Sequence, residues 1–243
     1  MMKPAVIGAL RSCFREKFGT PRQPHLAPGA PASLTILPEF FPAEALIGLE
    51  GFSHVWLLSW MHLNTNKSFH AKVHPPRLKG KNIGVFASRS PHRPSPIGLS
   101  LVRLLKVEGN TLHLAGVDLI DGTPILDVKP YIAESDSVPG AAAGWTAAAP
   151  FPTLEVAFAR QALSDIAAAE ARLALKGLRD LLADILKNDL RNPRDNAQGR
   201  EGLELGFYLH DFEARFEVRD GTVTLLRLAT GTQMHKKERR SAR

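Results

Sequence analysis

The sequence predicts an α+β protein that is mainly β, with an N-terminal closed β-barrel domain and a smaller C-terminal domain of helix and antiparallel strands. Short apolar runs rich in Val and Ile dominate the first 135 residues, and few helical patterns interrupt them. A helical segment follows at 160–189, and two further strand-like runs follow that helix. Many strands with few helices between them favour a closed or nearly closed barrel over a parallel sheet with crossover helices.

Apolar runs mark the expected strands of the barrel. Several are near-continuous rather than alternating, which is typical of strands buried on both faces, and His54 and Trp56 on one of them are expected in the core. Gly109-Asn110 joins two runs as a typical hairpin turn, and residues 42–51 predict a short helix closed by a glycine. The runs lie at 4–12, 32–37, 53–61, 82–88, 99–107, 111–120 and 125–132.

Composition sets the domain boundaries. Residues 1–135 form the expected barrel domain. Residues 136–153 carry small residues and three prolines without periodicity, so they are expected to be a linker. Residues 154–243 form the expected C-terminal α+β domain, which ends in a basic tail.

Three local sequence features predict the secondary structure of the C-terminal domain. Leu and Ile recur along 160–189 as an apolar stripe at helical spacing, and Gly177 is expected to split this segment into two helices. Asp220-Gly221 between two strand-like runs predicts a hairpin. The parity of the apolar positions switches at His210-Asp211, which predicts a bulge or sharp bend there.

Positive charge is concentrated in one segment. The chain has a formal net charge of +7, and residues 51–107 contain no Asp or Glu but nine Lys or Arg and five of the nine histidines. Such a long acid-free run favours a polyanionic partner such as RNA. The alternative is a solvated basic face without a partner.

Several classes of protein are excluded or disfavoured. Cys13 is the single cysteine, so no internal disulfide forms and a reducing cytoplasm is expected. No apolar run is long enough to span a membrane, and we expect no signal peptide. Glycine-rich nucleotide fingerprints are missing. His70 and His74 have helical ligand spacing but run into two prolines, so no metal is expected.

Polar loops with prolines are the candidate sites: residues 18–25, 84–100 and 118–131. The second holds three prolines with Arg89 and Arg93, and prolines hold loop side chains at fixed positions. Stiff loops that carry guanidinium and carboxylate groups on a β scaffold suit the binding of a small ligand. The alternatives are a plain turn at Asp121-Gly122 and exposed loop cations without a ligand.

Four long motifs carry a resemblance to a known family. "GLEGFSHVWLLSWMH", "PPRL", "GVFASRSPHRPSPIGLSLV" and "DLIDGTPILDVKPYI" resemble the bacterial tRNA threonylcarbamoyladenosine N6-methyltransferases, and the likeness extends over nearly the whole chain. The resemblance implies a β-barrel catalytic domain. It also implies methyl transfer from S-adenosyl-L-methionine to N6 of threonylcarbamoyladenosine, next to the anticodon of threonine tRNA.

The resemblance further implies a set of site residues, a homodimer whose site is shared between subunits, and tRNA as the partner. The general base is left open among His62, His25 and Asp121, and Arg89 is expected to orient the cofactor carboxylate or to stack on a planar group. Phosphate contacts are expected from Lys72, Arg77, Lys79, Lys81 and Arg93 of the acid-free segment. The expected cofactor-binding residues are Gln23, Pro24, His25, His62, Leu63, Arg89, Leu99, Gly122, Thr123, Pro124 and Ile125.

Two positions depart from the family pattern. Ser95 replaces the Asn of the usual Arg-Pro-Asn-Pro, and its hydroxyl is expected to support the turn. Residues 189–196 read "DLRNPRDN" where the family often has Asp-Pro-Arg-Pro followed by Tyr, which leaves the choice of tRNA open. Two alternatives to the enzyme remain: a non-catalytic RNA-binding module, and a methyltransferase with a different RNA or small-molecule acceptor.

Overall fold

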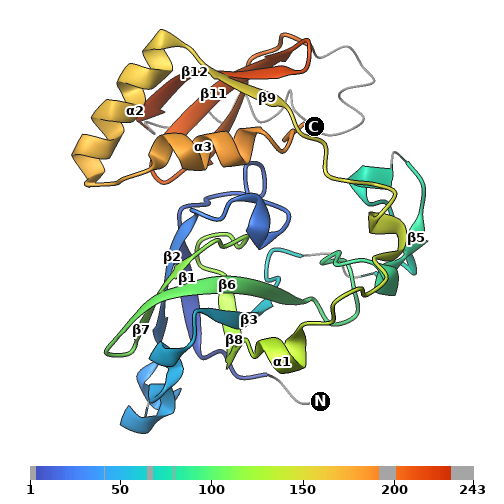
Figure 1. Ribbon diagram of the computed structural model, residues 1–243, viewed down its shortest axis with the longest axis vertical. Helices are drawn as coiled ribbons and strands as arrows, with labels where there is room; N and C mark the ends of the chain where they lie inside the picture. The colour runs from blue at the N-terminus through green and yellow to red at the C-terminus, as the bar shows by residue number, and fades with distance from the viewer. Residues whose placement is uncertain (1–3, 41, 65–67, 79, 192–200, 231–243) are drawn as a thin grey trace.

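The structure, a computed structural model, describes residues 4–40, 42–64, 68–78, 80–191 and 201–230. Antiparallel strands close a barrel in the order β1-β2-β7-β6-β3-β8, which confirms the predicted fold class (Figure 1). Gly109, at φ 57°, forms the predicted hairpin turn between β6 and β7. The barrel strands are β1 (Gly8–Ser12), β2 (Pro31–Ile36), β3 (His54–Trp60), β6 (Ile97–Glu108), β7 (Thr111–Ala115) and β8 (Pro124–Pro130).

Strand β3 shows how the barrel is filled. Val55, Leu57 and Ser59 point inward and are fully buried, while the residues between them lie on the outer face. His54 and Trp56 are therefore half-buried outside the barrel, so their expected place in the core is wrong. Their run is near-continuous in apolar residues because the outer face is also partly covered.

The run at 82–88 is not a barrel strand, which corrects the prediction. Only β5 (Ile83–Gly84) pairs, with β4 (Lys72–Val73), and a 3₁₀ turn at Val85–Ala87 follows. Prolines flank this run on both sides, and proline has no N–H to donate to a sheet. We call residues 61–96, which join β3 to β6, the excursion.

Short 3₁₀ turns occupy most other connections. The helix expected at 42–51 is instead two such turns, at Ala43–Leu46 and Leu49–Gly51. Gly48 between them has φ 86°, a left-handed conformation that interrupts a helix. The others lie at Pro24–Leu26, Pro38–Phe40, Pro76–Leu78 and Gly144–Thr146, and a one-turn helix, α1 (Ala133–Asp136), follows β8.

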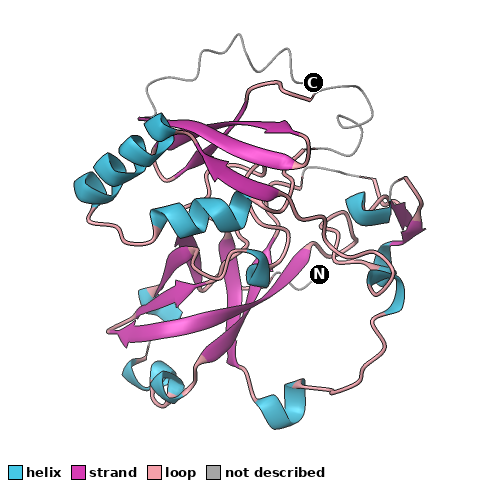
Figure 2. Ribbon diagram, turned by 45° about the horizontal axis from the view of Figure 1, so that its top comes forward, coloured by secondary structure: helices cyan, strands magenta, loops and turns pink. Residues whose placement is uncertain are grey.

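The C-terminal part is a sheet backed by two helices (Figure 2). Gly177, with φ 78°, precedes α3 and separates the helices as predicted. His210, with φ 54°, lies in the turn between β10 and β11, so the predicted bend is a tight hairpin. The elements are β9 (Glu155–Phe158), α2 (Arg160–Leu173), α3 (Leu178–Leu186), β10 (Leu205–Leu209), β11 (Phe212–Arg219) and β12 (Thr222–Thr230).

This sheet is not purely antiparallel. Its order is β10-β11-β12-β9, and β9 pairs with β12 in parallel. β9 was not predicted, because its four residues lie just before a helix and are too few for a clear alternation. The predicted hairpin at Asp220-Gly221 is confirmed between β11 and β12.

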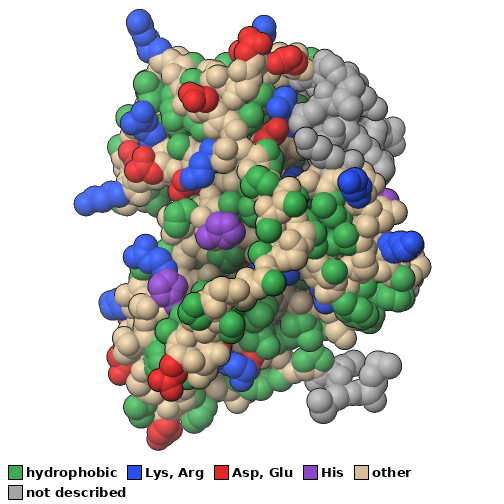
Figure 3. Space-filling view, turned by 45° about the vertical axis from the view of Figure 1, so that its right-hand side comes forward, with side chains coloured by type: hydrophobic (Ala, Val, Ile, Leu, Met, Phe, Trp, Pro, Cys, Tyr) green, Lys and Arg blue, Asp and Glu red, His purple; other side chains and the backbone are tan. Residues whose placement is uncertain are grey.

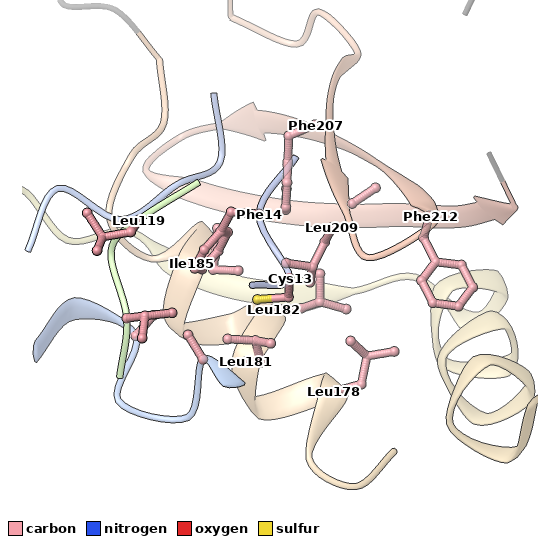
Figure 4. Packing of buried hydrophobic residues seen from close by; sticks show 14 of the residues in the cluster. Cys13, Phe14, Leu119, Leu178, Leu181, Leu182, Ile185, Phe207, Leu209 and Phe212 are labelled. Atoms are coloured by element: carbon pink, nitrogen blue, oxygen red, sulfur yellow. The ribbon is translucent and has the colours of Figure 1, made fainter. Parts of the chain in front are cut away.

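One continuous core joins the barrel to the C-terminal part (Figure 4). Phe14 forms an isolated bridge with Leu209, and the His210 N–H donates to the Cys13 carbonyl at 2.7 Å. Cys13, Phe14 and Phe207 are each at most 2% exposed. The C-terminal part therefore rests directly on the segment that follows β1.

Three long connections leave the barrel at the same end. β7 ends where Ala115 pairs with Pro31 at the start of β2. β3 ends where Ser59 pairs with Gly98 near the start of β6 and with Ile125 near the start of β8. We call this the loop end of the barrel; its connections are residues 13–30 (β1 to β2), the excursion at 61–96, and residues 116–123 (β7 to β8).

Candidate functional site

The loop end carries the residues that were expected to bind the cofactor. Gln23, Pro24 and His25 lie in the β1–β2 connection, His62, Leu63 and Arg89 lie in the excursion, and Leu99 lies near the start of β6. The turn of Gly122 and Thr123 leads into Pro124 and Ile125 at the start of β8. Segments that are far apart in sequence thus share one end of the barrel.

A hydrogen bond joins two of these connections. Arg89 donates from Nη1 to Gln23 Oε1 at 2.7 Å. A 3₁₀ turn follows Gln23 directly, with Pro24 as its first residue, and the Leu26 N–H donates to the Gln23 carbonyl at 3.1 Å. Pro24 and the 3₁₀ turn therefore fix the backbone next to Gln23. Arg89 is exposed on the excursion, and its guanidinium reaches Gln23 from there.

His25 lies beside Gln23 and meets the linker. Its ring contacts Phe151 edge-on at a centroid distance of 5.9 Å. Burial lowers the pKa of His25, and the positive charges of Arg77 and Arg89 lower it further. Protonation of this imidazole is therefore less favourable than that of an ordinary histidine.

Asp118 was one of the polar residues noted in the candidate loop 118–131, but it was not among the expected cofactor residues or bases. Its Oδ1 accepts a hydrogen bond of 2.6 Å from Ser100 Oγ. Burial raises its pKa to about 6, even though Ser100, its own backbone N–H and the charge of Arg89 act to lower it. A carboxylate set in the apolar run 114–120 was the signal that could have found it.

Asp121 is held by intramolecular contacts. Its carboxylate accepts from Arg15 Nη1 at 2.8 Å and from the Ser12 N–H at 3.0 Å. Next to it, Gly122 has φ 78°, and Thr123 Oγ1 donates to the Ile120 carbonyl. These contacts hold the turn before β8 against the end of β1. They agree with the alternative that Asp121-Gly122 is a plain turn.

The remaining expected cofactor residues are not brought into this cluster. His62 and Leu63 are exposed on the excursion. Leu99 is 49% exposed and points to the outer face of β6, whereas its neighbour Ser100 points inward. A hydrogen bond joins Gln23 to Arg89, and the charge of Arg89 acts on His25 and Asp118.

The excursion presents the basic residues expected to meet RNA. Lys72 and Lys81 are exposed, and the guanidinium of Arg93 lies 5.8 Å from the ring centre of Phe86, which is 74% exposed. The right-hand lobe in Figure 3 displays Lys, Arg and hydrophobic side chains, and no Asp or Glu is visible there. Lys79 lies outside the described residues.

Arg77 makes intramolecular contacts with the linker. Its guanidinium lies 4.0 Å from the ring centre of Phe151 and 5.2 Å from that of Trp145. It also donates from Nη2 to the Thr146 carbonyl at 3.0 Å. Trp145 in turn donates to the Ala87 carbonyl at 2.8 Å. Arg77 thus fastens the linker to the excursion, and a phosphate would have to compete with these contacts.

The two departures from the family pattern have different outcomes. The Ser95 carbonyl accepts from the Ile97 N–H at 2.7 Å, but in the described part of the chain its hydroxyl has no hydrogen-bond partner. The turn is therefore formed without the support expected from that hydroxyl. Asp189 and Arg191 form an ion pair at 2.8 Å, and residues 192–196 lie outside the described residues.

The described residues hold neither a metal-binding cluster nor a membrane-spanning helix. They contain no group of three or more His, Cys, Asp or Glu side chains placed to hold a metal ion. None of their helices has the length and hydropathy needed to cross a membrane.

Comparison with known proteins decides the family. A family model described as "tRNA-methyltransferase O N-terminal domain" matches residues 9–137. The sequence is also 43% identical over 229 residues to a Pseudomonas aeruginosa protein named "Putative S-adenosylmethionine-dependent methyltransferase RcsF", covering 93% of this chain and 96% of that protein. The chain belongs to the tRNA-methyltransferase O family. This confirms the family that the sequence motifs indicated.

Other relatives extend the comparison. The Escherichia coli (strain K12) "tRNA (adenine(37)-N6)-methyltransferase" is 37% identical over 219 residues, which cover 88% of this chain and 92% of that protein. A mouse protein of the same name is 56% identical over 133 residues, and this match spans only 31% of the mouse protein. A crystal structure of TrmO matches with a TM-score of 0.79 at 38% identity, covering 94% of this chain and 99% of that one.

Proposed function

We propose that the protein transfers a methyl group from S-adenosyl-L-methionine to N6 of threonylcarbamoyladenosine, next to the anticodon of threonine tRNA. The observation that carries the proposal is the Arg89–Gln23 pair at the loop end, beside the basic excursion. Membership of the tRNA-methyltransferase O family supports it, as do the relatives named for tRNA adenine methylation.

The residues at the loop end fit the chemistry of this cofactor. A guanidinium presents a planar fork of donors that suits a carboxylate, and Arg89 is exposed beside the amide of Gln23. Leu63, which is 60% exposed, offers apolar surface in the excursion at the same end of the barrel. When bound, S-adenosyl-L-methionine supplies a methyl group activated by a sulfonium centre.

This reaction needs positioning more than it needs a nucleophilic side chain. Methyl transfer is an in-line displacement, so holding donor and acceptor in line supplies much of the rate enhancement. Prolines stiffen two of the three connections at the loop end: Pro21 and Pro24 flank Gln23, and Pro91, Pro94 and Pro96 follow Arg89. Stiff connections keep Gln23 and Arg89 in place before the ligands arrive.

The excursion is the proposed contact for the tRNA backbone. Lys72, Lys81 and Arg93 lie in an acid-free segment and meet a polyanion without like-charge repulsion. Arg77 is committed to the linker, so we assign it to fastening the linker rather than to phosphate. A single cysteine and a tRNA substrate favour the cytoplasm as the compartment.

A homodimer is the proposed assembly. Ile97, Leu99 and Leu105 on the outer face of β6 are 45%, 49% and 55% exposed, which leaves apolar side chains on that face for a second copy to cover. Leu99 points away from the cluster of its own chain, so its expected role at the cofactor fits a site completed across an interface. Leu99→Asp should convert the dimer to a monomer in sedimentation velocity, and a variant that remains dimeric would contradict this interface.

One assay tests the proposed reaction. The protein is incubated with S-adenosyl-L-methionine labelled on the methyl group and with threonine tRNA that carries or lacks the threonylcarbamoyl group. Label should appear only in the modified tRNA. Label in the unmodified tRNA would contradict the acceptor, and cofactor binding without transfer to either tRNA would favour a non-catalytic RNA-binding module.

A further inference from the structure

The carboxylate of Asp118 and the hydroxyl of Ser100 form a hydrogen-bonded pair at the loop end. Ser100 points into the barrel and is 2% exposed, and its hydroxyl donates to Asp118 Oδ1 at 2.6 Å. In the described part of the chain, Asp118 Oδ2 receives no side-chain donor. Ser100 thus holds one oxygen of the carboxylate, and no described side chain donates to the other.

The backbone on both sides of Asp118 is fixed. Val117 and Leu119 are 0% and 3% exposed and belong to the core. The Gly116 N–H donates to the Ala30 carbonyl at 2.8 Å, and Ser12 Oγ donates to the Leu119 carbonyl at 2.7 Å. Because its neighbours are packed and hydrogen-bonded, the carboxylate has a defined position without any ligand.

A second buried polar atom lies at the same end of the barrel. Ser59 is 0% exposed, and its hydroxyl is the buried side-chain polar atom without a hydrogen-bond partner among the described residues. Ser59 pairs with Gly98, two residues before Ser100 on β6. A buried polar atom without a partner is unfavourable and calls for an explanation, and Ser59 places one on the strand next to Ser100.

The other candidate bases are less suited to receive a proton. Asp121 is held by Arg15 and by the Ser12 N–H. His62 is exposed, and its described hydrogen bond is made by its backbone N–H rather than by its ring. His25 would become a cation when protonated, and the charges of Arg77 and Arg89 already oppose that form. Asp118 becomes neutral when protonated, which its burial favours.

We infer that Asp118 is the general base that removes the N6 proton of the acceptor, and that Ser100 positions it. The inference rests on the proposed function. The N6–H bond breaks and its proton goes to Asp118 Oδ2. The nitrogen electron pair forms the N–CH₃ bond while the bond from methyl to sulfur breaks and leaves its electron pair on the sulfur. The products are N6-methylated threonylcarbamoyladenosine and S-adenosylhomocysteine.

The acidity of Asp118 suits this role. Its pKa of about 6 leaves it ionised at pH 7 but more basic than an ordinary aspartate. Arg89 is the charged group that acts on it within the described residues, and Ser100 lowers its pKa through the hydrogen bond. The methylation rate should rise as pH increases through the range of this pKa and then level off.

The test measures single-turnover methylation of threonylcarbamoyl-tRNA from pH 5 to 9, together with cofactor and tRNA affinity. Asp118→Asn should lower the rate constant by about 100-fold or more, while both affinities change by less than about threefold. Ser100→Ala should move the rise of the pH profile to higher pH, because the carboxylate loses its hydrogen bond. Asp127→Asn is the matched control, since Asp127 pairs with Lys129 on the surface of β8.

The outcomes distinguish a failure of the base role of Asp118 from a failure of the proposed function. An Asp118→Asn variant that methylates at the wild-type rate overturns the base role and leaves the proposed function intact. Loss of cofactor binding in that variant also overturns it, because Asp118 would then be a cofactor ligand. If Asp118→Asn fails to fold, as judged by circular dichroism, an unshifted pH profile for Ser100→Ala overturns the inference. A wild-type protein that methylates no tRNA overturns the proposed function and this inference together.

Discussion

Arg89 reaches across the loop end to donate a 2.7 Å hydrogen bond to Gln23, which lies 66 positions earlier in the sequence. The bond joins the excursion to the β1–β2 connection, and the charge of Arg89 also acts on His25 and Asp118. One guanidinium therefore links the groups of the candidate site. The excursion also bears the exposed cations, so the proposed cofactor and RNA contacts share one segment.

Removing a cation of the excursion should weaken tRNA binding in a salt-dependent way. Lys72→Ala or Arg93→Ala each removes one proposed phosphate contact, so the slope of log K against log salt concentration should fall by about 1. Fluorescence anisotropy with labelled tRNA at several salt concentrations measures this slope. An unchanged slope in both variants would place the RNA on another surface.

Arg77→Ala should instead reduce stability. The variant loses the hydrogen bond to the Thr146 carbonyl and the stacking on Phe151. We expect the free energy of unfolding to fall by about 1–3 kcal/mol, which lowers Tm by several degrees. Arg77→Lys should not restore it, because an ammonium has no planar face for the ring. Thermal unfolding measures both variants, and a wild-type Tm for Arg77→Ala would show that the linker is fastened elsewhere.

Asp118→Asn should stabilise the folded protein at neutral pH. Burial raises the pKa of Asp118 to about 6 in the folded protein, above its value of about 3.9 in an unfolded chain. The folded state therefore binds this proton more tightly, and the stability due to Asp118 is lost as pH rises through this interval. The variant should have a higher Tm than wild type at pH 7.5, and the difference should shrink toward pH 4. An equal or lower Tm at pH 7.5 would indicate that Asp118 is not destabilised by burial.

Cys13 should be unreactive until the protein unfolds. Burial raises the pKa of its thiol to about 12, and the residue is 2% exposed. Since the thiolate is the reactive form, alkylation at pH 8 should be much slower in the native protein than in denaturant. Mass spectrometry over time follows the reaction. Equal rates in both conditions would mean that the shared core around Phe14 opens readily.

Strands with strong apolar patterns were predictable because their own residues determine them. Turns such as Gly109-Asn110 and Asp220-Gly221 were found for the same reason, since each needs residues that tolerate positive φ. The run at 82–88 was misassigned because its Val and Ile resemble a barrel strand, whereas only Ile83–Gly84 pairs, in a small sheet with β4 outside the barrel. β9 was missed because its pairing with β12 depends on a partner 67 positions away.

The sequence predicted which residues belong to the candidate site better than it predicted the contacts between them. The motifs identified Gln23 and Arg89, but the hydrogen bond between them follows from the barrel topology that brings their connections to one end. Asp118 was noted in one candidate loop but was given no role, because its importance depends on burial and on Ser100, which are properties of the folded chain. Arg77 carries the same charge as its neighbours in the sequence, and its contacts with the linker became visible only in three dimensions.

The most direct test of the site is calorimetric titration of S-adenosyl-L-methionine into the wild type, Arg89→Ala and Arg219→Ala. Arg219 is the matched control, because its exposed guanidinium pairs with Glu217 on the C-terminal sheet. The account predicts that Arg89→Ala loses cofactor affinity by about 10-fold or more, in keeping with the loss of a charge-assisted hydrogen bond, while Arg219→Ala binds as the wild type does. Unchanged affinity in Arg89→Ala, with the variant folded, would contradict a cofactor site at the loop end of the barrel.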